Sequence, residues 1–374
     1  MKILVGDILE SKAETLVNTV NCVGVMGKGI ALEFKNRFPE MYADYIERCN
    51  RGEVKPGLPY MYRTLFPPHV VNFPTKDHWK SVSKISDIEH GLKYLVTHYK
   101  KWGVESLAIP PLSCGNGQLE WRSVGPLIYR YAKQMNVPVE MYAPYGTSPK
   151  ELTWEFLEKG GEAFADRPAR NGEPGSDAAW VSLVEIVRRI EQQPYHWPIG
   201  RTIFQKIAFV ATSEGLPTRL NYRRGSFGPF SQELKSVEAK LINNGLLQEE
   251  RQGKMFMVKV GPNFDRIRQR YAPAFDQWAT IVSKTSDLFA RVDTNQAEVI
   301  ATVLFAAQEL GRVQDAQPNE KDVLQSVMQW KQKRRPPLDE ATVASTIRNL
   351  GMLRWLDVKA SPDLRLPEEE ALAA

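Results

Sequence analysis

The chain has 374 residues, of which 43% are hydrophobic and 25% are charged. This is ordinary globular composition, which excludes disordered and fibrous proteins, and the length predicts two domains. No apolar run reaches the roughly 20 residues of a membrane helix, and the first residues lack a signal-peptide pattern. We therefore expect a cytoplasmic protein that has no membrane partner.

The formal net charge is +5, and the whole excess lies in residues 1–150, which carry 19 Lys and Arg against 14 Asp and Glu. A positive balance of this size suits a polyanionic partner, although many proteins with such a charge bind nothing anionic. Three cysteines, Cys22, Cys49 and Cys114, lack the spacing of a disulfide framework or a zinc site. We expect reduced thiols, no bound metal and no cofactor.

Strand-like and helix-like patterns alternate over the first 145 residues. The β-rich runs are residues 2–5, 15–20, 70–73, 106–109 and 137–141. Helical spacing is found between them, in residues 30–37, 85–101 and 124–135. This alternation predicts an α/β fold with a mixed sheet covered by helices, and such sheets bind ligands at the carboxyl ends of their strands.

Two of the loops at strand ends are rich in glycine. The first glycine loop consists of Gly24, Val25, Met26, Gly27, Lys28 and Gly29, and the second consists of Ser113, Cys114, Gly115, Asn116 and Gly117. Glycine lets backbone N–H groups approach an oxygen ligand, and a helix N-terminus adds partial positive charge. Neither loop has Walker A or dinucleotide spacing. Each loop alone is also consistent with a tight turn, but together they could hold a diphosphate from both sides.

Four separated motifs resemble those of macrodomains, the ADP-ribose-binding α/β/α fold with a mixed sheet in three layers. They are Gly6-Asp-Ile-Leu9, Asn18-Thr-Val-Asn21 before the first glycine loop, Asn72-Phe-Pro-Thr-Lys-Asp-His-Trp79, and Leu112-Ser-Cys-Gly-Asn-Gly117. Within that fold, the chain is similar to the DarG family of DNA ADP-ribosyl glycohydrolase antitoxins, which reverse the DNA modification made by DarT toxins. The resemblance covers about residues 1–145.

The resemblance also implies roles for single residues that bind ADP-ribose. Asp7 is expected to accept a hydrogen bond from the adenine amino group, with Ile8 beside it as a backbone donor or packing partner. A turn cap is the alternative role for Asp7. Asn21 is expected to face the distal ribose, whereas Asn18 is expected to tie down the loop. Both glycine loops are expected to cradle the phosphates and distal ribose, with Lys28 adding charge.

The pair Thr75-Lys76 matches the family position at which a lysine acts on the anomeric carbon of the distal ribose. As a neutral amine, Lys76 could attack that carbon, and as an ammonium it could stabilise charge on the departing base. Both routes stay open. Lys80, four residues further on, is the neighbouring lysine that could be mistaken for the reactive one. In glycohydrolase relatives an aspartate stands where this chain has Gly117, so activation of water falls to the substrate phosphate or to a carboxylate such as Asp77.

The aromatic and cationic residues His78, Trp79 and Lys80 follow this lysine directly. They could hold an extruded nucleotide by stacking and phosphate contact. Ordinary packing of Trp79 is the equal alternative.

We predict a macrodomain over residues 1–157, a linker over 158–178 and a C-terminal domain over 179–374. The linker is rich in Pro, Gly and Arg. The C-terminal domain should be mainly helical. Three helices, at about 181–190, 203–210 and 234–242, and a hairpin around Gln252-Gly253 make a winged-helix-like pattern over 180–262. Further helices at 296–310 and 321–331 lead to about residue 358, and 368–374 is expected to be a loose tail.

Three functions remain open on these grounds. The first is an antitoxin enzyme that removes ADP-ribose from bases of single-stranded DNA and inhibits a DarT-like ADP-ribosyltransferase toxin through its C-terminal domain. The others are a non-catalytic ADP-ribose reader that binds a partner, and a winged-helix transcriptional regulator. Thymine and guanine linkages present the same sugar carbon, so the modified base is not specified.

Overall fold

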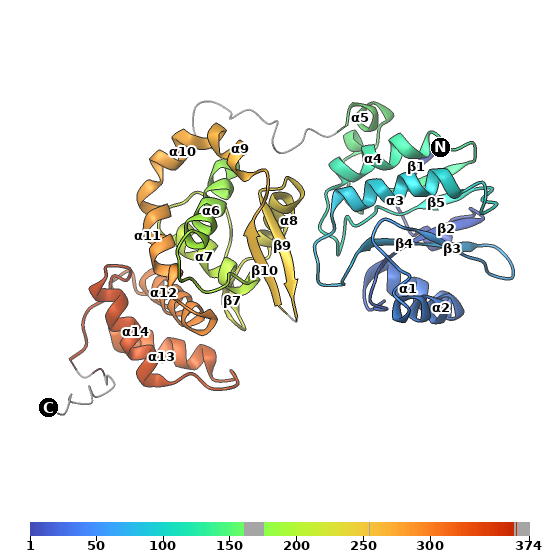
Figure 1. The fold of residues 1–374 in the computed structure, drawn as a ribbon. Coiled ribbons are helices and arrows are strands. Elements are labelled where there is room, and N and C mark those ends of the chain that lie inside the picture. Colours follow the sequence, from blue (N-terminus) through green and yellow to red (C-terminus); the bar gives the residue numbers. More distant parts are fainter. Residues whose placement is uncertain (161–175, 254, 363, 365–374) are drawn as a thin grey trace. The chain divides into compact units, whose positions relative to one another are not determined.

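The structure, a computed structural model, describes residues 1–160, 176–253, 255–362 and 364 (Figure 1). The chain divides into two compact units, Met1–Pro168 and Ala169–Ala374. Residues 161–175 of the expected linker and the whole expected tail, 368–374, lie outside the described residues. The domain bounds given above therefore stay a prediction.

The first unit is an α/β/α structure built on one six-stranded sheet. Its strands are β1 (Lys2–Leu4), β2 (Thr15–Asn21), β3 (Tyr60–Tyr62), β4 (His69–Lys76), β5 (Leu107–Ile109) and β6 (Val139–Tyr142). Its helices are α1 (Gly29–Arg37), α2 (Pro39–Asn50), α3 (Ile85–His98), α4 (Trp121–Ala132) and α5 (Trp154–Lys159). The strand order is β1-β6-β5-β2-β4-β3, parallel except for β3 against β4. The predicted α/β class with a mixed sheet is confirmed.

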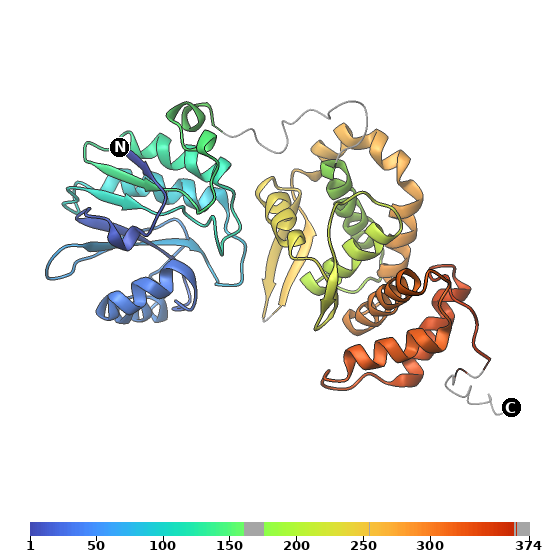
Figure 2. The same ribbon diagram turned by 180° about the vertical axis from the view of Figure 1, so that it is seen from behind.

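Helices cover both faces of this sheet, with α1 and α2 on one face and α3 and α4 on the other (Figure 1 and, from behind, Figure 2). Phe34, Met41 and Tyr45 fill the core under α1 and α2, whereas Phe73 and Leu92 belong to the core under α3 and α4. Both central strands, β2 and β4, are buried almost throughout. Burial along nearly the whole strand is typical of parallel strands that are covered on both sides.

Strand β3 and helix α2 of the first unit were not predicted. Strand β3 has only three half-buried residues, too few for a clear alternation of polar and apolar side chains. Helix α2 did have a signal, because Pro39 stands at its first position and Met41 and Tyr45 are buried four residues apart. This helix matters below, since it supports the first glycine loop.

The second unit is mainly helical. Its elements are α6 (Ser176–Glu191), α7 (Arg201–Ser213), β7 (Arg223–Gly225), β8 (Gly228–Phe230), α8 (Glu233–Asn243), β9 (Leu247–Gln252), β10 (Met255–Val260), α9 (Phe264–Arg268), α10 (Ala272–Gln277), α11 (Ala279–Ala290), α12 (Thr294–Gln314), α13 (Glu320–Lys331) and α14 (Glu340–Met352). Three helices followed by the β9–β10 hairpin appear in the predicted order, but an unpredicted hairpin, β7–β8, lies between α7 and α8. No helix in the described ranges has both the length and the apolar character that a bilayer crossing requires.

A close approach of helix α3 to the sheet gives a test of this packing. A Cβ atom at Gly91 of α3 would lie 2.3 Å from the ring of Phe73, which is fully buried in β4. We expect Gly91→Ala to destabilise the first unit by about 1–3 kcal/mol, because such a core has no room for the extra methyl group. Denaturant unfolding followed by tryptophan fluorescence measures this loss.

Gly311→Ala in α12 is the matched helical control. Its Cβ would make only ordinary contacts, with the nearest atom 3.8 Å away. It should leave stability unchanged or raise it by up to about 1 kcal/mol. Equal unfolding midpoints for Gly91→Ala and the wild type would contradict this description of the core.

Candidate functional site

Three segments meet at the carboxyl edge of the sheet, at the ends of β2, β4 and β5. Lys76, the last residue of β4, donates from Nζ to the carbonyl oxygen of Asn116 at 3.1 Å. A Cβ atom at Gly29 would lie 3.0 Å from Nδ2 of the same asparagine. The predicted lysine and the two glycine loops are therefore neighbours, although 40 residues separate Lys76 from Asn116 in the sequence.

The first glycine loop is held by the side chain of Asn21, the last residue of β2. Its Nδ2 donates to the carbonyl of Val25 at 2.6 Å, and its Oδ1 accepts from the N–H of Val23 at 2.9 Å. The hydroxyl of Tyr45, from α2, donates to the same Oδ1 at 3.1 Å and to the Asn21 carbonyl at 2.9 Å. The amide that sequence analysis assigned to the distal ribose thus shapes the loop.

Asn18 contacts the first glycine loop from below, because its Nδ2 donates to the Sδ atom of Met26 at 4.0 Å. It lies fully buried within β2, and its Nδ2 donates to Oδ1 of Asn72 on the adjacent β4 at 3.0 Å. Nδ2 of Asn72 in turn donates to the hydroxyl of Tyr60 on β3 at 3.2 Å. Asn18 therefore joins strands in the interior of the sheet and contacts the loop through Met26, whereas Asn21 makes hydrogen bonds to the loop backbone.

The first glycine loop leads directly into helix α1. Lys28 is the N-cap residue of α1, has extended backbone, and makes no side-chain capping hydrogen bond. The first N–H groups of any helix lack partners within the helix and carry partial positive charge, so they favour an anion. Gly29 follows with a φ of +58°, which glycine adopts without strain. Met26 is buried in the core, so it can serve a ligand only through its backbone.

The second glycine loop is packed against the segment that follows β4. Oγ of Ser83 donates to Oγ of Ser113 at 2.9 Å, and the Ser83 N–H donates to the carbonyl of Gly117 at 3.3 Å. A Cβ atom at Gly117 would lie 2.3 Å from the Cβ of Ser113. No carboxylate fits here without moving the loop, whereas a Cβ atom at Gly115 would meet nothing within 4 Å.

Asp7 and Ile8 follow β1, so they also lie at the carboxyl ends of the strands. Strand β1 is the outermost strand, at the opposite end of the strand order from β4 and β3. One carboxylate oxygen of Asp7 accepts from the N–H of Leu9 at 2.9 Å and caps a short 3-10 helix, Ile8–Glu10. The turn cap considered for Asp7 is therefore present. Asp7 is exposed, whereas the side chain of Ile8 is buried in the core.

Few side chains at this edge can act as nucleophiles. Burial raises the pKa of the Cys22 thiol and of the Cys114 thiol to about 12 each, so both stay protonated at neutral pH and react poorly. The buried hydroxyl of Thr75 donates to the carbonyl of Val20 at 3.4 Å and so turns toward β2. Lys76 is the residue singled out for chemistry whose amine lies where the loops meet, so it is the candidate nucleophile.

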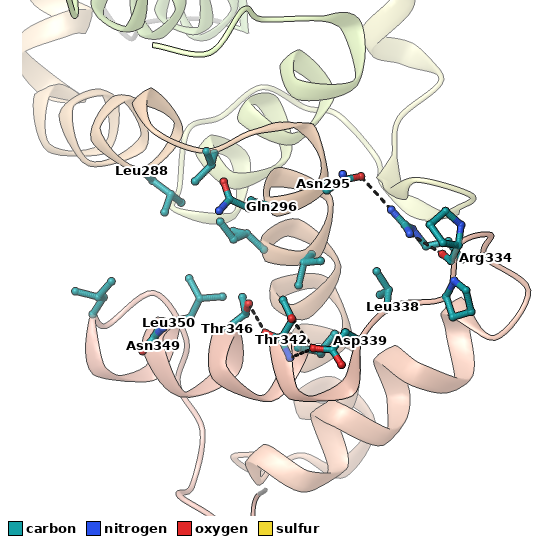
Figure 3. Close-up of a pocket in the computed structure, with 17 residues that line it drawn as sticks. Leu288, Asn295, Gln296, Arg334, Leu338, Asp339, Thr342, Thr346, Asn349 and Leu350 are labelled. Carbon is teal, nitrogen blue, oxygen red and sulfur yellow. Dashed lines mark hydrogen bonds between the residues drawn. The ribbon is translucent and has the colours of Figure 1, made fainter. Parts of the chain in front are cut away.

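The second unit holds a cavity of about 470 Å³, bounded by α11, α12, α14 and the segment before α14 (Figure 3). Several of its polar groups already have partners. Asp339 accepts from the N–H of Thr342 at 2.8 Å and caps α14, and Arg334 donates to Glu298 and Asn295. The cavity therefore offers an apolar hollow rather than a reactive group. In the described parts of the chain, no three His, Cys, Asp or Glu side chains are grouped to hold a metal ion.

Comparison with known proteins agrees with this architecture. Residues 17–128 match the Macro domain family. A DNA ADP-ribosyl glycohydrolase of Mycobacterium tuberculosis is 36% identical over 246 residues, which cover 62% of this chain and 64% of that protein. A DNA ADP-ribosyl transferase-DNA ADP-ribosyl glycohydrolase fusion protein of Thermosipho africanus is 40% identical over 166 residues, 38% of this chain and 42% of that protein.

Among solved structures, the macrodomain of Mycobacterium tuberculosis DarG is 44% identical, with a TM-score of 0.38, and the match covers 38% of this chain and 97% of that one. The match to the full-length mycobacterial relative spans less than two thirds of its length. Residues 17–128 therefore form a Macro domain, and over 62% of its length the chain is similar in sequence to a DNA ADP-ribosyl glycohydrolase.

Proposed function

We propose that the first unit hydrolyses the N-glycosidic bond between ADP-ribose and a DNA base, as the names of its mycobacterial and Thermosipho relatives describe for those proteins. The observation that carries the proposal is the meeting of Lys76 with both glycine loops at one edge of the sheet. A cradle of backbone N–H groups and an adjacent amine are the two parts that binding and cleavage of an ADP-ribosyl group require.

The spacing of the strands supports the orientation of the ligand. Asp7 follows β1 and Lys76 ends β4, and four strand-to-strand steps separate these strands in the order β1-β6-β5-β2-β4. At 4.7–4.9 Å per step this amounts to roughly 19 Å, a span that an extended nucleotide diphosphate sugar can bridge. Adenine would then lie near Asp7 and the distal ribose near Lys76, with the diphosphate between the glycine loops.

Lys76 would act on the anomeric carbon of that distal ribose. In one route its neutral amine attacks the carbon and the base leaves with a proton on its nitrogen. The resulting glycosylamine opens its sugar ring to an imine, and water later releases ADP-ribose from the lysine. In the other route the ammonium stabilises negative charge on the departing base while water adds directly to the carbon. Both routes consume one water molecule and yield ADP-ribose and the unmodified base.

Activation of the water has to be assigned without a carboxylate at Gly117, where packing leaves no room for one. Asp77 is exposed next to Lys76, and one of its carboxylate oxygens accepts from the N–H of His78 at 2.8 Å. Either this carboxylate or a phosphate oxygen of the substrate would take the proton from water. The same missing carboxylate favours the alternative function, a reader that binds ADP-ribose without cleaving it.

We further propose that the second unit captures and inhibits a DarT-like ADP-ribosyltransferase, so that the protein is the antitoxin of a toxin-antitoxin pair. The fusion of both activities in the Thermosipho relative supports such a partnership. Phe227, at the tip of the β7–β8 hairpin, is 66% exposed. The hairpin is fixed by two buried lysines, since Lys206 donates to the Pro229 carbonyl and Lys331 to the Ser226 carbonyl, each at 2.8 Å. A rigid aromatic tip suits an anchor for a protein partner.

Removal of the Lys76 amine tests the enzyme proposal. We expect Lys76→Ala to lower release of ADP-ribose from ADP-ribosylated single-stranded DNA by about a hundredfold or more. Chromatography of the released ADP-ribose gives the rate, and Lys93→Ala, an exposed lysine of α3, is the matched control. Release by Lys76→Ala at the wild-type rate would exclude a catalytic role for Lys76, and binding without release by the wild type would favour the reader.

Lys76→Arg separates the two routes, because arginine keeps the positive charge but is not a nucleophile at neutral pH. The electrostatic route predicts partial activity for this variant. The covalent route predicts a rate as low as that of Lys76→Ala, and it also predicts that borohydride reduction during turnover adds the mass of a reduced ADP-ribosyl group to Lys76 in the wild type.

Substitution of Phe227 tests the partner proposal in the full-length chain. With a cognate ADP-ribosyltransferase co-expressed, Phe227→Ser should raise the Kd for capture by about thirtyfold, the typical loss at an aromatic hot spot. Tyr195→Ser, which removes an even more exposed aromatic residue, is the control and should retain capture. Unchanged capture by Phe227→Ser would place the interface elsewhere, and no capture by the wild type would reject the partnership.

A further inference from the structure

The segment between β4 and α3 contains an aromatic pair beside the proposed reaction centre. The rings of His78 and Trp79 are stacked, with centroids 5.5 Å apart and planes 26° apart. The Nζ atom of Lys80 lies 4.9 Å from the centroid of the Trp79 ring. Trp79 nevertheless remains 47% exposed. We refer to His78, Trp79 and Lys80 together as the stacking platform.

Local hydrogen bonds hold the stacking platform in shape. The Ser81 N–H donates to the His78 carbonyl at 3.0 Å and closes a tight turn with Trp79 and Lys80 at its tip. The Lys80 N–H donates to Nδ1 of His78 at 3.1 Å, which fixes the orientation of the imidazole ring. A platform that is ordered before its ligand arrives loses little conformational entropy on binding.

Both ends of this segment are tied to the glycine loops. At its start, the Cys22 N–H, just before the first glycine loop, donates to the Asp77 carbonyl at 3.1 Å. At its end, Ser83 bonds to Ser113 and Gly117 in the second glycine loop. Trp79 is three residues from Lys76, so their Cα atoms lie at most about 11 Å apart. The platform thus flanks the place proposed for the distal ribose and the base attached to it.

The charge of the segment selects among possible ligands. Residues 76–84 carry three lysines, Lys76, Lys80 and Lys84, against one aspartate, Asp77. An exposed aromatic face with adjacent cations is the combination that binds single-stranded nucleic acid, because bases stack on the ring and phosphates pair with the cations. In duplex DNA, a base that carries ADP-ribose must also leave the stack before the carbon that joins it to ADP-ribose can reach Lys76.

We propose that the stacking platform binds a nucleotide of the single-stranded DNA next to the ADP-ribosylated base, stacking that base on Trp79 and pairing its phosphate with Lys80. This rests on the proposed glycohydrolase function and adds to it a residue set that recognises the DNA rather than the ADP-ribose. The platform makes an oligonucleotide a better substrate than the isolated modified nucleoside.

Two substrates separate this contribution from catalysis. One is a single-stranded oligonucleotide with one ADP-ribosylated base, and the other is the ADP-ribosylated nucleoside obtained from it by digestion. Stacking of one base is worth about 1–3 kcal/mol, so for Trp79→Ala we expect the KM for the oligonucleotide, relative to that for the nucleoside, to rise about tenfold. Trp79→Phe should keep most of this preference, and Trp154→Ala, which removes an exposed tryptophan of α5, should keep all of it.

A direct binding measurement keeps the proposal testable without turnover. Fluorescence anisotropy with an unmodified single-stranded oligonucleotide at low salt should show a Kd about tenfold higher for Trp79→Ala, and for Lys80→Gln a weaker dependence of the Kd on salt. An equal KM ratio in Trp79→Ala and wild type, or equal oligonucleotide affinity, would overturn the platform. Failure of the wild type to release ADP-ribose from either substrate would instead reject the glycohydrolase function. The anisotropy measurement would then decide alone whether the stacking platform binds single-stranded DNA.

Discussion

The contact of Lys76 Nζ with the Asn116 carbonyl is the interaction on which the proposed site depends. It joins the end of β4 to the second glycine loop, and the Asn116 amide lies against Gly29 in the first. Parallel strands end at one edge of a sheet, so the topology brings these loops close together. This contact fixes the position of the Lys76 amine relative to the two glycine loops. An ADP-ribose whose diphosphate binds both loops would place its distal ribose beside this amine.

Exposed turns in both units are stabilised in the same way. A buried side-chain donor forms a hydrogen bond to a backbone carbonyl of the turn. In the first unit, the Tyr45 hydroxyl binds the Asn21 carbonyl beneath the first glycine loop. In the second unit, Lys206 and Lys331 bind carbonyls of the turn that carries Phe227. Burial of Lys206 lowers its pKa to about 8, so the charge that holds this turn sits in an environment that disfavours it. Such turns keep one shape because their polar groups are satisfied from inside the protein.

The sequence predicted every strand of the first unit's sheet except β3, and the two glycine loops, because β-rich runs and glycine spacing are local signals. The choice of Lys76 came from the family resemblance. The sequence assigned Asn21 to the distal ribose and Asn18 to the loop, but it did not predict that Asn21 itself shapes the loop backbone. Both are asparagines of one strand, three residues apart, and only the structure shows that Asn18 pairs with Asn72 on the next strand while Asn21 turns to the loop. The supporting partners Tyr45 and Ser83 were missed for the same physical reason, since contacts across 24 and 30 residues leave no local pattern.

The loss of the carboxylate at Gly117 was visible in the sequence, but its structural cause was not. The position is closed by Ser113 and Ser83, so a carboxylate side chain does not fit there unless these residues move. Any hydrolysis must therefore draw its proton acceptor from Asp77 or from the substrate. In the proposed function, the end of β4 and the segment that follows it would therefore supply Lys76, Asp77 and the stacking platform together.

The most direct test of the central claim is a crystal structure of the full-length chain with ADP-ribose bound. The account predicts the diphosphate on backbone N–H groups of both glycine loops and the anomeric carbon of the distal ribose within about 4 Å of Lys76 Nζ, the contact range for reacting atoms. An empty cleft, or a distal ribose turned away from an amine that points into solvent, would contradict it.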